Sequence, residues 1–550
     1  MNKTKNFQPV FLFLTYFIIG ITVLLTFKDY GVHIEEKFHR MNGLYWLNYI
    51  SQVFNFEKIS LITDIKMKEI SDYTLSSVKH YNKYGAIFDL PAAYIEVLFN
   101  IKNIENIYYL KHLLSFTIFL ISSFFFYKIL LQRFNNFFLS ISGTLIFITT
   151  PRIFGDSFFY KDVLFLSFFN IALYFLLKLL ENLNFKNILY FSIFSAMAFN
   201  LRVFALFLPI TFLILLIIKS LNDKKIYNYL KIYFFYLFIF ISLIICFSPY
   251  LWSSPLNNLL EIFLSLKKDL IGSNIKILFN GEFINNRILP DSYLPVWIFI
   301  STPIITLTFF LLGYFFYLKR FINRFIKIKE KQIFPDLWRG QREQKDFILF
   351  FILTSFLFAV LFFNSPFYNG WRLVYFLNIF IVYFAIYQIN NFIILNKRYA
   401  LKKKLIIFII LFLITHNVVS LITYHPYQSY YFNELLSDKS KNSFEGDYHG
   451  ISGKHFFLKL ISENKDKKIK VAVASYTPLH RSFESLNLKL VRNFEVIGQD
   501  YKNADYIYKN NISEVNSYLN KKYNIPNNFV KIYELNIDGL IIYEIFKNIK

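Results

Sequence analysis

Long apolar stretches alternate along the chain with short stretches rich in lysine and arginine. A helix needs about 20 apolar residues to cross the hydrocarbon core of a bilayer. By that criterion the pattern predicts eleven spans, at residues 9–27, 111–131, 137–150, 159–178, 188–201, 203–218, 232–248, 294–318, 347–364, 372–394 and 405–422. The third and fifth spans are short, so we expect each to be tilted, re-entrant or half of a broken helix.

The basic connections predict an orientation. Segments such as "QRFNN", "KSLNDKKIYNYLK" and "NKRYALKKK" fall on alternate connections, and short basic loops favour the cytoplasmic side. Residues 28–110, 150–158, 249–292, 365–371 and the tail from 423 are then expected outside. The first span, "FLFLTYFIIGITVLLTF", has no small-residue cleavage site after it, so we expect it to stay in the protein.

Two parts are predicted. Residues 1–422 form an α-helical polytopic membrane domain, and its outer loop 28–110 carries helices such as "GLYWLNYISQVFNF" that lie in the membrane interface. Residues 423–550 form a small extracytoplasmic α/β domain, with strands expected at "KIKVAVASYT", "SFESLNLKLV" and "ADYIYKN".

Composition agrees with a membrane protein and excludes other classes. Hydrophobic residues make up 55% of the chain, and the mean hydropathy is +0.40. The net charge of +24 is concentrated in short loops, which argues for membrane orientation and against nucleic-acid binding. The single cysteine, Cys246, excludes a disulfide within the chain and a cysteine-based metal site.

The segment "GVHIEEKFHR" carries the first candidate chemistry, because Glu35 and Glu36 lie between His33 and His39. A carboxylate at a membrane surface can act as a general base, although a solvated pair of loop charges fits the same pattern. The spacing matches no strict metal-ligand motif, so we predict no metal and no cofactor. In "YGAIFDLPAAYIE", Asp89 is a second candidate for contact with substrate, or a plain helix cap beside Pro91.

Basic residues at the ends of predicted spans form the second group. "TTPRIFGDSFFYKDVLF" contains Arg152, Asp156 and Lys161, which fit either a phosphate site or cations that reach the interface beside paired acids. Further candidates are Arg202 in "FNLRVF", Arg372 in "YNGWR" and His425 in "HPYQSYYFNEL". Ionisable groups at membrane depth are costly, so each is a functional hypothesis, with structural ion pairing as the alternative.

These motifs together resemble the GT-C superfamily of polytopic glycosyltransferases. The nearest resemblance is to family 39-like members, which include protein O-mannosyltransferases and lipid A aminoarabinose transferases. The motifs that carry it run in order from residue 31 to residue 435: "VHIEEKFHR", "TPRIFGDSFFYKD", "NLRVF", "SPYLW", "LPVWI", "YNGWR" and "HPYQSYYFNEL". Glu35 and Glu36 stand where the family has an aspartate as catalytic base, which is a departure from the pattern.

The resemblance implies an inverting transfer of sugar from a polyprenyl-phosphate donor to a lipid, glycan or protein acceptor outside a bacterial inner membrane. In that reading, Glu35, Glu36 and Asp156 are the catalytic candidates. Candidates to bind the lipid phosphate or the sugar are Arg152, Lys161, Arg202, Arg372, Asp89 and His425. Three alternatives stay open: a transporter or flippase of lipid-linked substrates, a non-catalytic membrane scaffold, and an enzyme of the same architecture with another donor, such as an oligosaccharide ligase or polymerase.

Overall fold

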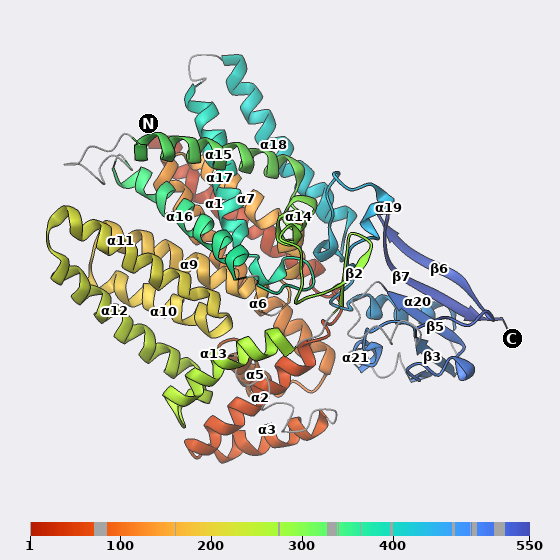
Figure 1. Cartoon of the computed structure of the whole chain (residues 1–550). Coiled ribbons are helices and arrows are strands. Elements are labelled where there is room, and N and C mark those ends of the chain that lie inside the picture. The colour runs from red at the N-terminus through yellow and green to blue at the C-terminus, as the bar shows by residue number, and fades with distance from the viewer. Residues whose placement is uncertain are drawn as a thin grey trace.

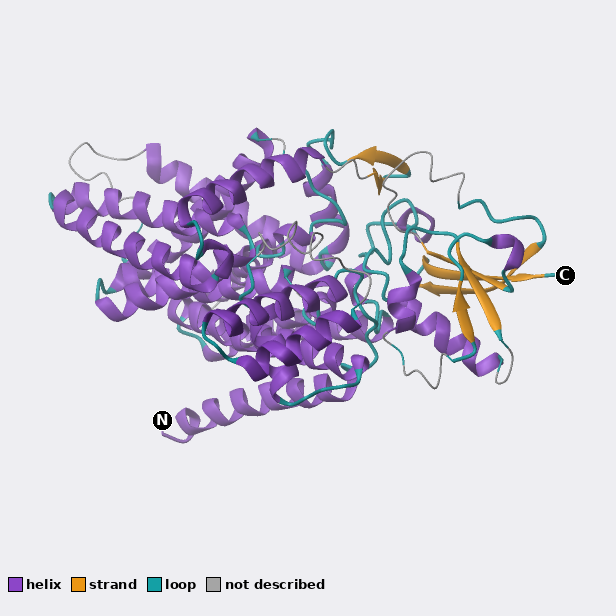
Figure 2. Ribbon diagram, turned by 90° about the horizontal axis from the view of Figure 1, so that it is seen from below, coloured by secondary structure: helices purple, strands orange, loops and turns teal. Residues whose placement is uncertain are grey.

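The protein consists of a large helical body with a β-sheet module at one end (Figures 1 and 2). The computed structural model describes residues 2–70, 85–159, 161–272, 276–326, 338, 340–363, 365–395, 400–464, 468–484, 486, 492–510 and 523–549. The sheet module contains the C-terminal end of the described chain, and the helices of the body extend away from it (Figure 2).

Nine helices of the described residues are long and apolar enough to cross a membrane. They are α1 (Asn2–Thr26), α6 (Ile104–Phe134), α9 (Asp162–Glu181), α11 (Phe207–Asp223) with the 3₁₀ turn η1 (Val203–Leu206) before it, α12 (Ile226–Phe247), α15 (Ile304–Ile326), α16 (Gln341–Phe362), α17 (Leu377–Leu395) and α18 (Ala400–Thr423). Other helices cover most of α9 and α17, whereas α1 is almost wholly uncovered. Because α9 and α17 lie at the centre, the loops at their ends are the places where several helices can meet around one site.

The predicted class, a polytopic helical membrane protein with a small C-terminal α/β module, is confirmed. The third and fifth predicted spans correspond to α7 (Phe137–Thr149) and α10 (Phe185–Leu201), which have 13 and 17 residues and are indeed short. The predicted span 294–318 is wrong as one helix, because α14 (Tyr293–Ser301) ends before α15 begins. Thr302 is extended there, as the residue before a proline commonly is, and Pro303 follows it.

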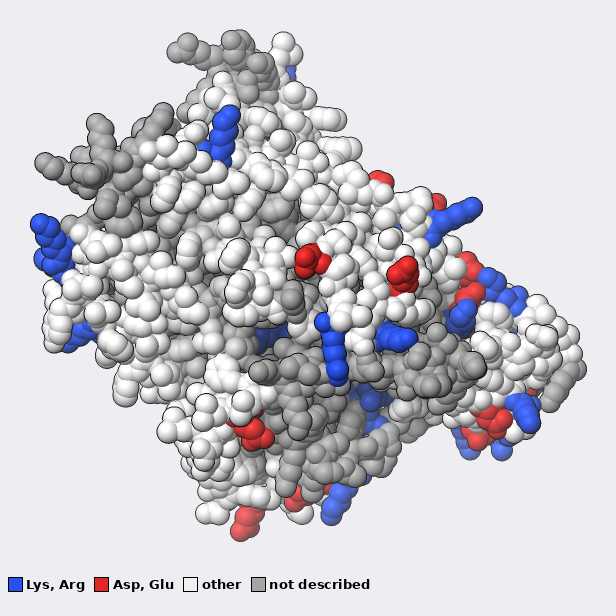
Figure 3. Space-filling model, in the orientation of Figure 1, with Lys and Arg blue, Asp and Glu red and all other residues white. Residues whose placement is uncertain are grey.

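The surface of the helical body is apolar over a broad area. Phe13, Leu25 and Phe238 are more than 60% exposed on α1 and α12, and the visible face of the body is mostly uncharged, whereas charged side chains collect on the module and at the edges (Figure 3). Soluble proteins rarely expose such continuous apolar area, so lipid covers these helices.

Short helices lie together beside the body, at the bottom of Figure 1. Two of them, α2 (Glu36–Val53) and α5 (Asp89–Leu98), pack against each other, and α3 (Glu57–Glu69) packs on α2. Inside this group the Glu96 carboxylate takes a bidentate bond from Arg40, at 2.8 and 3.1 Å, and lies 3.0 Å from Lys66. The segment predicted to be an interfacial helix is therefore helical. The start of α2, at Glu36, lies beside the membrane-spanning helices.

Lys345 and Asp346, in the second turn of α16, connect the ends of several spans by ion pairs. Asp346 accepts two bonds from Arg133 at the end of α6, at 2.6 and 2.7 Å, and a third from the Tyr383 hydroxyl on α17. Lys345 pairs with Glu181 at the end of α9. These buried charges are compensated within the protein, as charges at membrane depth must be.

A five-stranded mixed sheet, in the order β4-β3-β5-β7-β6, forms the core of the module. Its strands are β3 (Ile469–Val473), β4 (Phe494–Val496), β5 (Tyr506–Asn510), β6 (Phe529–Ile537) and β7 (Leu540–Asn548). The strand β3 runs parallel to β4 and β5, and β7 runs antiparallel to β5 and β6. Asp538 and Gly539 both have positive φ, as the tight β6–β7 hairpin requires.

Strands predicted at "KIKVAVASYT" and "ADYIYKN" are confirmed as β3 and β5. The one expected at "SFESLNLKLV" is wrong in its first three residues, which end α21 (Leu479–Glu484), while residues 487–491 lie outside the described part. The other elements are α8 (Pro151–Asp156), α13 (Pro255–Gly272), β1 (Lys276–Phe279), β2 (Glu282–Asn285), α19 (Asp438–Lys441), α20 (Ser452–Glu463), and the 3₁₀ turns η2 (Pro249–Leu251), η3 (Arg372–Val374), η4 (Gln428–Tyr430) and η5 (Tyr501–Asn503).

Gly313 sets the distance between α15 and α17. A β-carbon at this position would lie 2.1 Å from the Phe384 backbone oxygen, so the packing admits only glycine. We expect Gly313→Leu to lower the free energy of unfolding by about 1–3 kcal/mol through overpacking. Gly20→Leu on α1, which would meet nothing within 4 Å, is the matched control. Thermal unfolding in detergent tests this, and equal midpoints for the two variants would contradict it.

Candidate functional site

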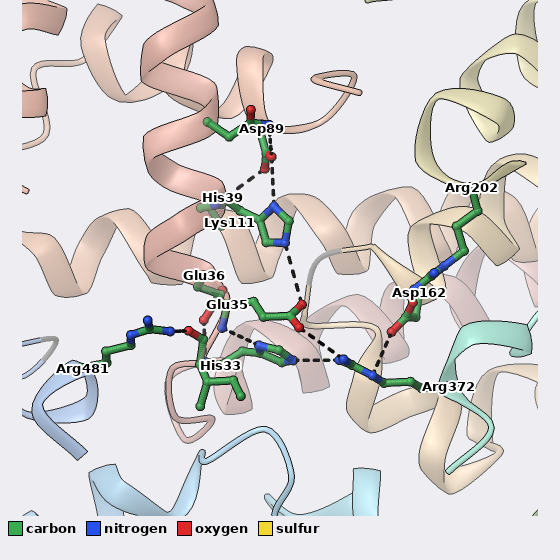
Figure 4. Close-up of polar contacts among 12 residues, drawn as sticks. His33, Glu35, Glu36, His39, Asp89, Lys111, Asp162, Arg202, Arg372 and Arg481 are labelled. Atoms are coloured by element: carbon green, nitrogen blue, oxygen red, sulfur yellow. Dashed lines mark hydrogen bonds and ion pairs between the residues drawn. The ribbon is translucent and has the colours of Figure 1, made fainter. Parts of the chain in front are cut away.

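The loop before α2 brings Glu35 and Glu36 into different surroundings (Figure 4). Glu36 is 2% exposed; it accepts a bond from the His33 backbone N–H at 2.9 Å and lies 3.1 Å from Nε2 of His112. The Glu35 side chain is 40% exposed, and its Oε1 lies 3.2 Å from Nη2 of Arg372. Glu36 therefore holds the loop in shape, whereas Glu35 is the carboxylate that a substrate can reach.

Arg372 is the centre of the site. It lies on η3, just before the central helix α17, and only 4% of its side chain is exposed. Besides Glu35, its guanidinium lies 3.3 Å from Nε2 of His33 and 3.8 Å from Oδ2 of Asp162. The ring of Tyr368 covers the guanidinium at 5.1 Å. Arg372 thus joins the loop of Glu35 to the beginning of α9.

Two further cations lie at the same place. Arg202, between α10 and η1, pairs with Asp162 at the first residue of α9. Lys161 precedes Asp162 with a φ of 93°, and burial together with the neighbouring Arg202 lowers the pKa of its ammonium group to about 7. Glu35 and Asp162 oppose this shift, so Lys161 lies within electrostatic reach of both carboxylates.

The balance of charge favours an anion. Lys161, Arg202 and Arg372 are three cationic groups that face the two carboxylates of Glu35 and Asp162. The N-terminus of α9, where backbone N–H groups are unsatisfied and the helix dipole is positive, lies in the same place. The negative charge of a ligand phosphate would compensate the positive charge of these side chains and of the helix N-terminus.

Ionisation of Glu35 is secured by its neighbours. Burial alone raises its pKa, but Arg372 and the imidazoles of His39 and His33 lower it more, so the pKa of Glu35 lies well below its usual range. The carboxylate is therefore charged at neutral pH. As long as Arg372 is paired only with Glu35 and Asp162, Glu35 is also a weak base.

Asp89 does not contact Glu35 directly; among the described residues, His39 lies between the two carboxylates. Its carboxylate accepts a bond from Asn42 at 3.0 Å and lies 3.2 Å from Nδ1 of His39, whose Nε2 is 3.9 Å from Glu35. Lys111 lies 3.9 Å from the other oxygen of Asp89. The prediction that Asp89 caps a helix is wrong: it is the first residue of α5 and makes no side-chain cap bond, because its carboxylate faces α2 instead.

Arg152, Asp156 and His425 have other partners than the pair of Glu35 and Arg372. The fully buried Arg152 donates from Nε to the Tyr431 backbone oxygen at 2.8 Å, and its guanidinium lies 5.0 Å from the ring of Trp297. Asp156 lies 2.8 Å from Nε2 of His449. His425 lies 2.8 Å from Asp29. Of the residues predicted as site members, the structure brings together Glu35, Lys161, Arg202 and Arg372.

Sequence reasoning did not single out several members of the site. Asp162 belongs to the charged cluster of Arg152, Asp156 and Lys161 in the sequence, but the pattern predicts no role for it. His33 and His39 were considered only as metal ligands. His449 had no signal, because it lies far along the chain in the part expected to be a separate module. Among the described residues, no group of three or more His, Cys, Asp or Glu side chains is arranged to hold a metal ion.

Comparison with known proteins finds a distant likeness among solved structures. No protein-family model matches the chain, and no curated protein matches its sequence. Among solved structures it is similar to ArnT from Cupriavidus metallidurans bound to undecaprenyl phosphate, with 9% sequence identity and a TM-score of 0.39. The match covers 84% of this chain and 88% of that chain.

The different surroundings of the two glutamates predict different effects on stability. Glu36→Gln replaces a buried carboxylate that holds the loop and contacts His112, and we expect a loss of about 1–3 kcal/mol in the free energy of unfolding. Glu35→Gln should cost less, because this side chain is partly exposed and Asp162 remains beside Arg372 to compensate its charge. Thermal unfolding of the two purified variants measures the difference, and a larger loss for Glu35→Gln would contradict the assignment of roles.

Proposed function

We propose that this protein is a membrane glycosyltransferase that moves a sugar from a polyprenyl-phosphate donor to an acceptor hydroxyl, with Glu35 as the base. The observation that carries the proposal is the ion pair of a reachable carboxylate, Glu35, with the buried Arg372, beside Lys161 and Arg202. Such an arrangement offers a base and an anion site side by side, at the ends of helices that cross the membrane.

Transfer requires two events that this site can serve. Glu35 accepts the proton of the acceptor hydroxyl, whose oxygen forms a bond to the anomeric carbon of the sugar. The bond from that carbon to the phosphate oxygen breaks, and the electron pair leaves with the lipid phosphate. Lys161, Arg202 and Arg372 stabilise the negative charge that develops on this leaving group. A single displacement of this kind inverts the anomeric centre.

Arg372 couples donor binding to the basicity of Glu35. In the free protein the guanidinium lowers the pKa of the carboxyl. A donor phosphate that binds Arg372 adds a second negative charge next to Glu35, and like charges raise the pKa of a carboxyl. Glu35 is therefore a weak base that stays unprotonated in the free protein. It becomes a stronger base once the donor phosphate has bound.

The location of the reaction follows from the predicted orientation. The basic connections favour an orientation in which the loop of Glu35 and the C-terminal module face away from the cytoplasm. We propose the inner membrane of a bacterium as the setting, with a lipid, glycan or protein as the acceptor. The long apolar tail of a polyprenyl donor would remain in the bilayer beside the exposed helices, and its phosphate would reach the charged group at their ends.

Replacement of the base tests the function directly. Membranes containing the protein are incubated with polyprenyl-phosphate sugars, and transfer is measured for wild type, Glu35→Gln and the control Glu434→Gln. Glu434 is 56% exposed and pairs with His416, away from the site. Loss of a general base should lower kcat by about 10²–10⁴-fold in Glu35→Gln. Transfer at wild-type rates in that variant would remove Glu35 from the mechanism. Movement of donor across the bilayer without any transfer would favour a transporter.

The low pKa of Lys161 predicts a pH dependence. Lys161 loses its charge as the pH rises through about 7, so the KM for a phosphodiester-linked donor, which does not titrate in this range, should rise between pH 6 and 8. The pKa of Glu35 lies far below this interval, so Glu35 does not oppose the trend. Lys161→Arg should reduce the rise, because a guanidinium stays charged. The remaining rise would come from Glu445 near Arg372, because burial raises the pKa of Glu445 to about 8.

The control for that experiment is Lys459→Met on α20, where the lysine is 38% exposed and pairs with Glu463. This variant should keep the wild-type dependence of KM on pH. Persistence of the same rise in KM in Lys161→Arg would show that another group titrates, and the placement of Lys161 at the donor phosphate would be wrong.

A further inference from the structure

The segment 445–451, which leads into α20, passes directly against the loop that carries Glu35. The Ile34 backbone N–H donates to the His449 backbone oxygen at 2.9 Å. A β-carbon on Gly31 would lie 2.1 Å from the Ile451 backbone oxygen, so the two segments are in contact along their backbones. The loop before α2 is therefore fixed from outside by a part of the chain more than 400 residues away.

His449 makes the principal side-chain contacts between the two segments. Its ring lies 4.2 Å from the ring of His33, and its Nε2 lies 2.8 Å from Oδ1 of Asp156 on α8. The His449 and Asp156 side chains are only 3% and 4% exposed. His33 in turn accepts a bond at Nδ1 from the Glu35 backbone N–H, at 2.9 Å. A chain of contacts thus runs from Asp156 through the two imidazoles to the backbone of Glu35.

The module adds a contact of its own. Arg481 on α21 donates to the Ile34 backbone oxygen, so the peptide groups on both sides of Ile34 are held (Figure 4). Residues 445–451 also contact the turn that carries Arg372, because the Tyr448 hydroxyl lies 3.5 Å from the Tyr375 hydroxyl. Burial raises the pKa of Glu445 to about 8, although the backbone of Gly370 and the charge of Arg372 oppose the shift. Residues 445–451 therefore border both halves of the Glu35–Arg372 pair.

We propose that residues 445–451 position Glu35 relative to Arg372, and that the His449–Asp156 pair is the principal positioning element. The catalytic consequence rests on the proposed function; the structural one does not. Glu35 precedes α2 in an irregular loop, and such a loop alone would populate several conformations. A base displaced by about 1 Å loses much of its effect on rate, about 10²-fold in unfavourable cases.

Two substitutions of His449 separate its contacts. His449→Phe keeps a ring against His33 but has no donor for Asp156, whereas His449→Gln keeps an amide N–H for Asp156 and lacks the ring. The matched control is His455→Phe on α20, because His455 bonds to the Tyr427 hydroxyl at 2.8 Å and not to the loop. Hydrogen–deuterium exchange of peptides that cover residues 31–40, and kcat and donor KM for transfer, are measured for each protein.

We expect the Ile34 amide to exchange about 10-fold faster in His449→Phe than in wild type. In His449→Gln the increase should be smaller, and in His455→Phe the rate should equal that of wild type. The kcat should fall in the same order by about 10-fold or more while the donor KM changes little, because the phosphate site is intact. Exchange equal to wild type in both His449 variants would overturn the proposal. A lower kcat without faster exchange would also overturn it, since His449 would then act on substrate rather than on the loop.

Sugar transfer and hydrogen exchange test the two parts of the proposal separately. If the wild type transfers no sugar, the proposed function fails, and the exchange measurement still decides whether His449 orders the loop. Where a His449 variant does not fold, Arg481→Met tests the same loop from the module. It removes the donor to the Ile34 oxygen, and it too should speed exchange at residues 31–36. Unchanged exchange in Arg481→Met, measured on folded protein, would count against positioning by this segment.

Discussion

The ion pair between Glu35 and Arg372 is the interaction on which the arrangement of the site depends. It connects a loop near the start of the chain with the turn before the central helix α17, and Asp162 extends it to the start of α9. A guanidinium that is only 4% exposed needs negative partners, since an uncompensated charge in a low-dielectric environment is expensive. The need to compensate Arg372 therefore brings three separate segments to one point. The same three segments supply the base Glu35, the cations Arg372 and Lys161, and the helix N-terminus of the proposed chemistry.

The two ends of the spans use charge in different ways. At the far ends, Asp346, Glu181 and Glu343 are matched by arginine and lysine from neighbouring helices, so these clusters serve packing. At the end near Glu35, burial and the charges of Arg202 and Arg372 lower the pKa of Lys161 to about 7. A buried basic group with so perturbed a pKa distinguishes a place that receives an anion from one that only holds helices together.

Much of the fold followed from local pattern, and the site followed only in part. Apolar stretches predicted the spans, because about 20 apolar residues leave few alternatives to a membrane helix, but Pro303 divided one of them. Glu35, Lys161, Arg202 and Arg372 were recognisable because ionisable groups at membrane depth are costly. Side-chain direction was not predictable: Glu35 and Glu36 look equivalent in sequence, and only the position of His112 beside Glu36 shows that the second is structural. His449 was not predictable either, since contact between distant segments leaves no local pattern.

The bond from the Ile34 N–H to the His449 oxygen has a consequence for how the protein is made. During synthesis, the helices that follow Ile34 enter the membrane long before the ribosome reaches His449. The loop of Glu35 therefore lacks this hydrogen-bond partner while nearly every later span is being inserted. If the proposed function holds, a newly inserted chain becomes competent only after residues 445–451 have been translated and have packed against the loop of Glu35.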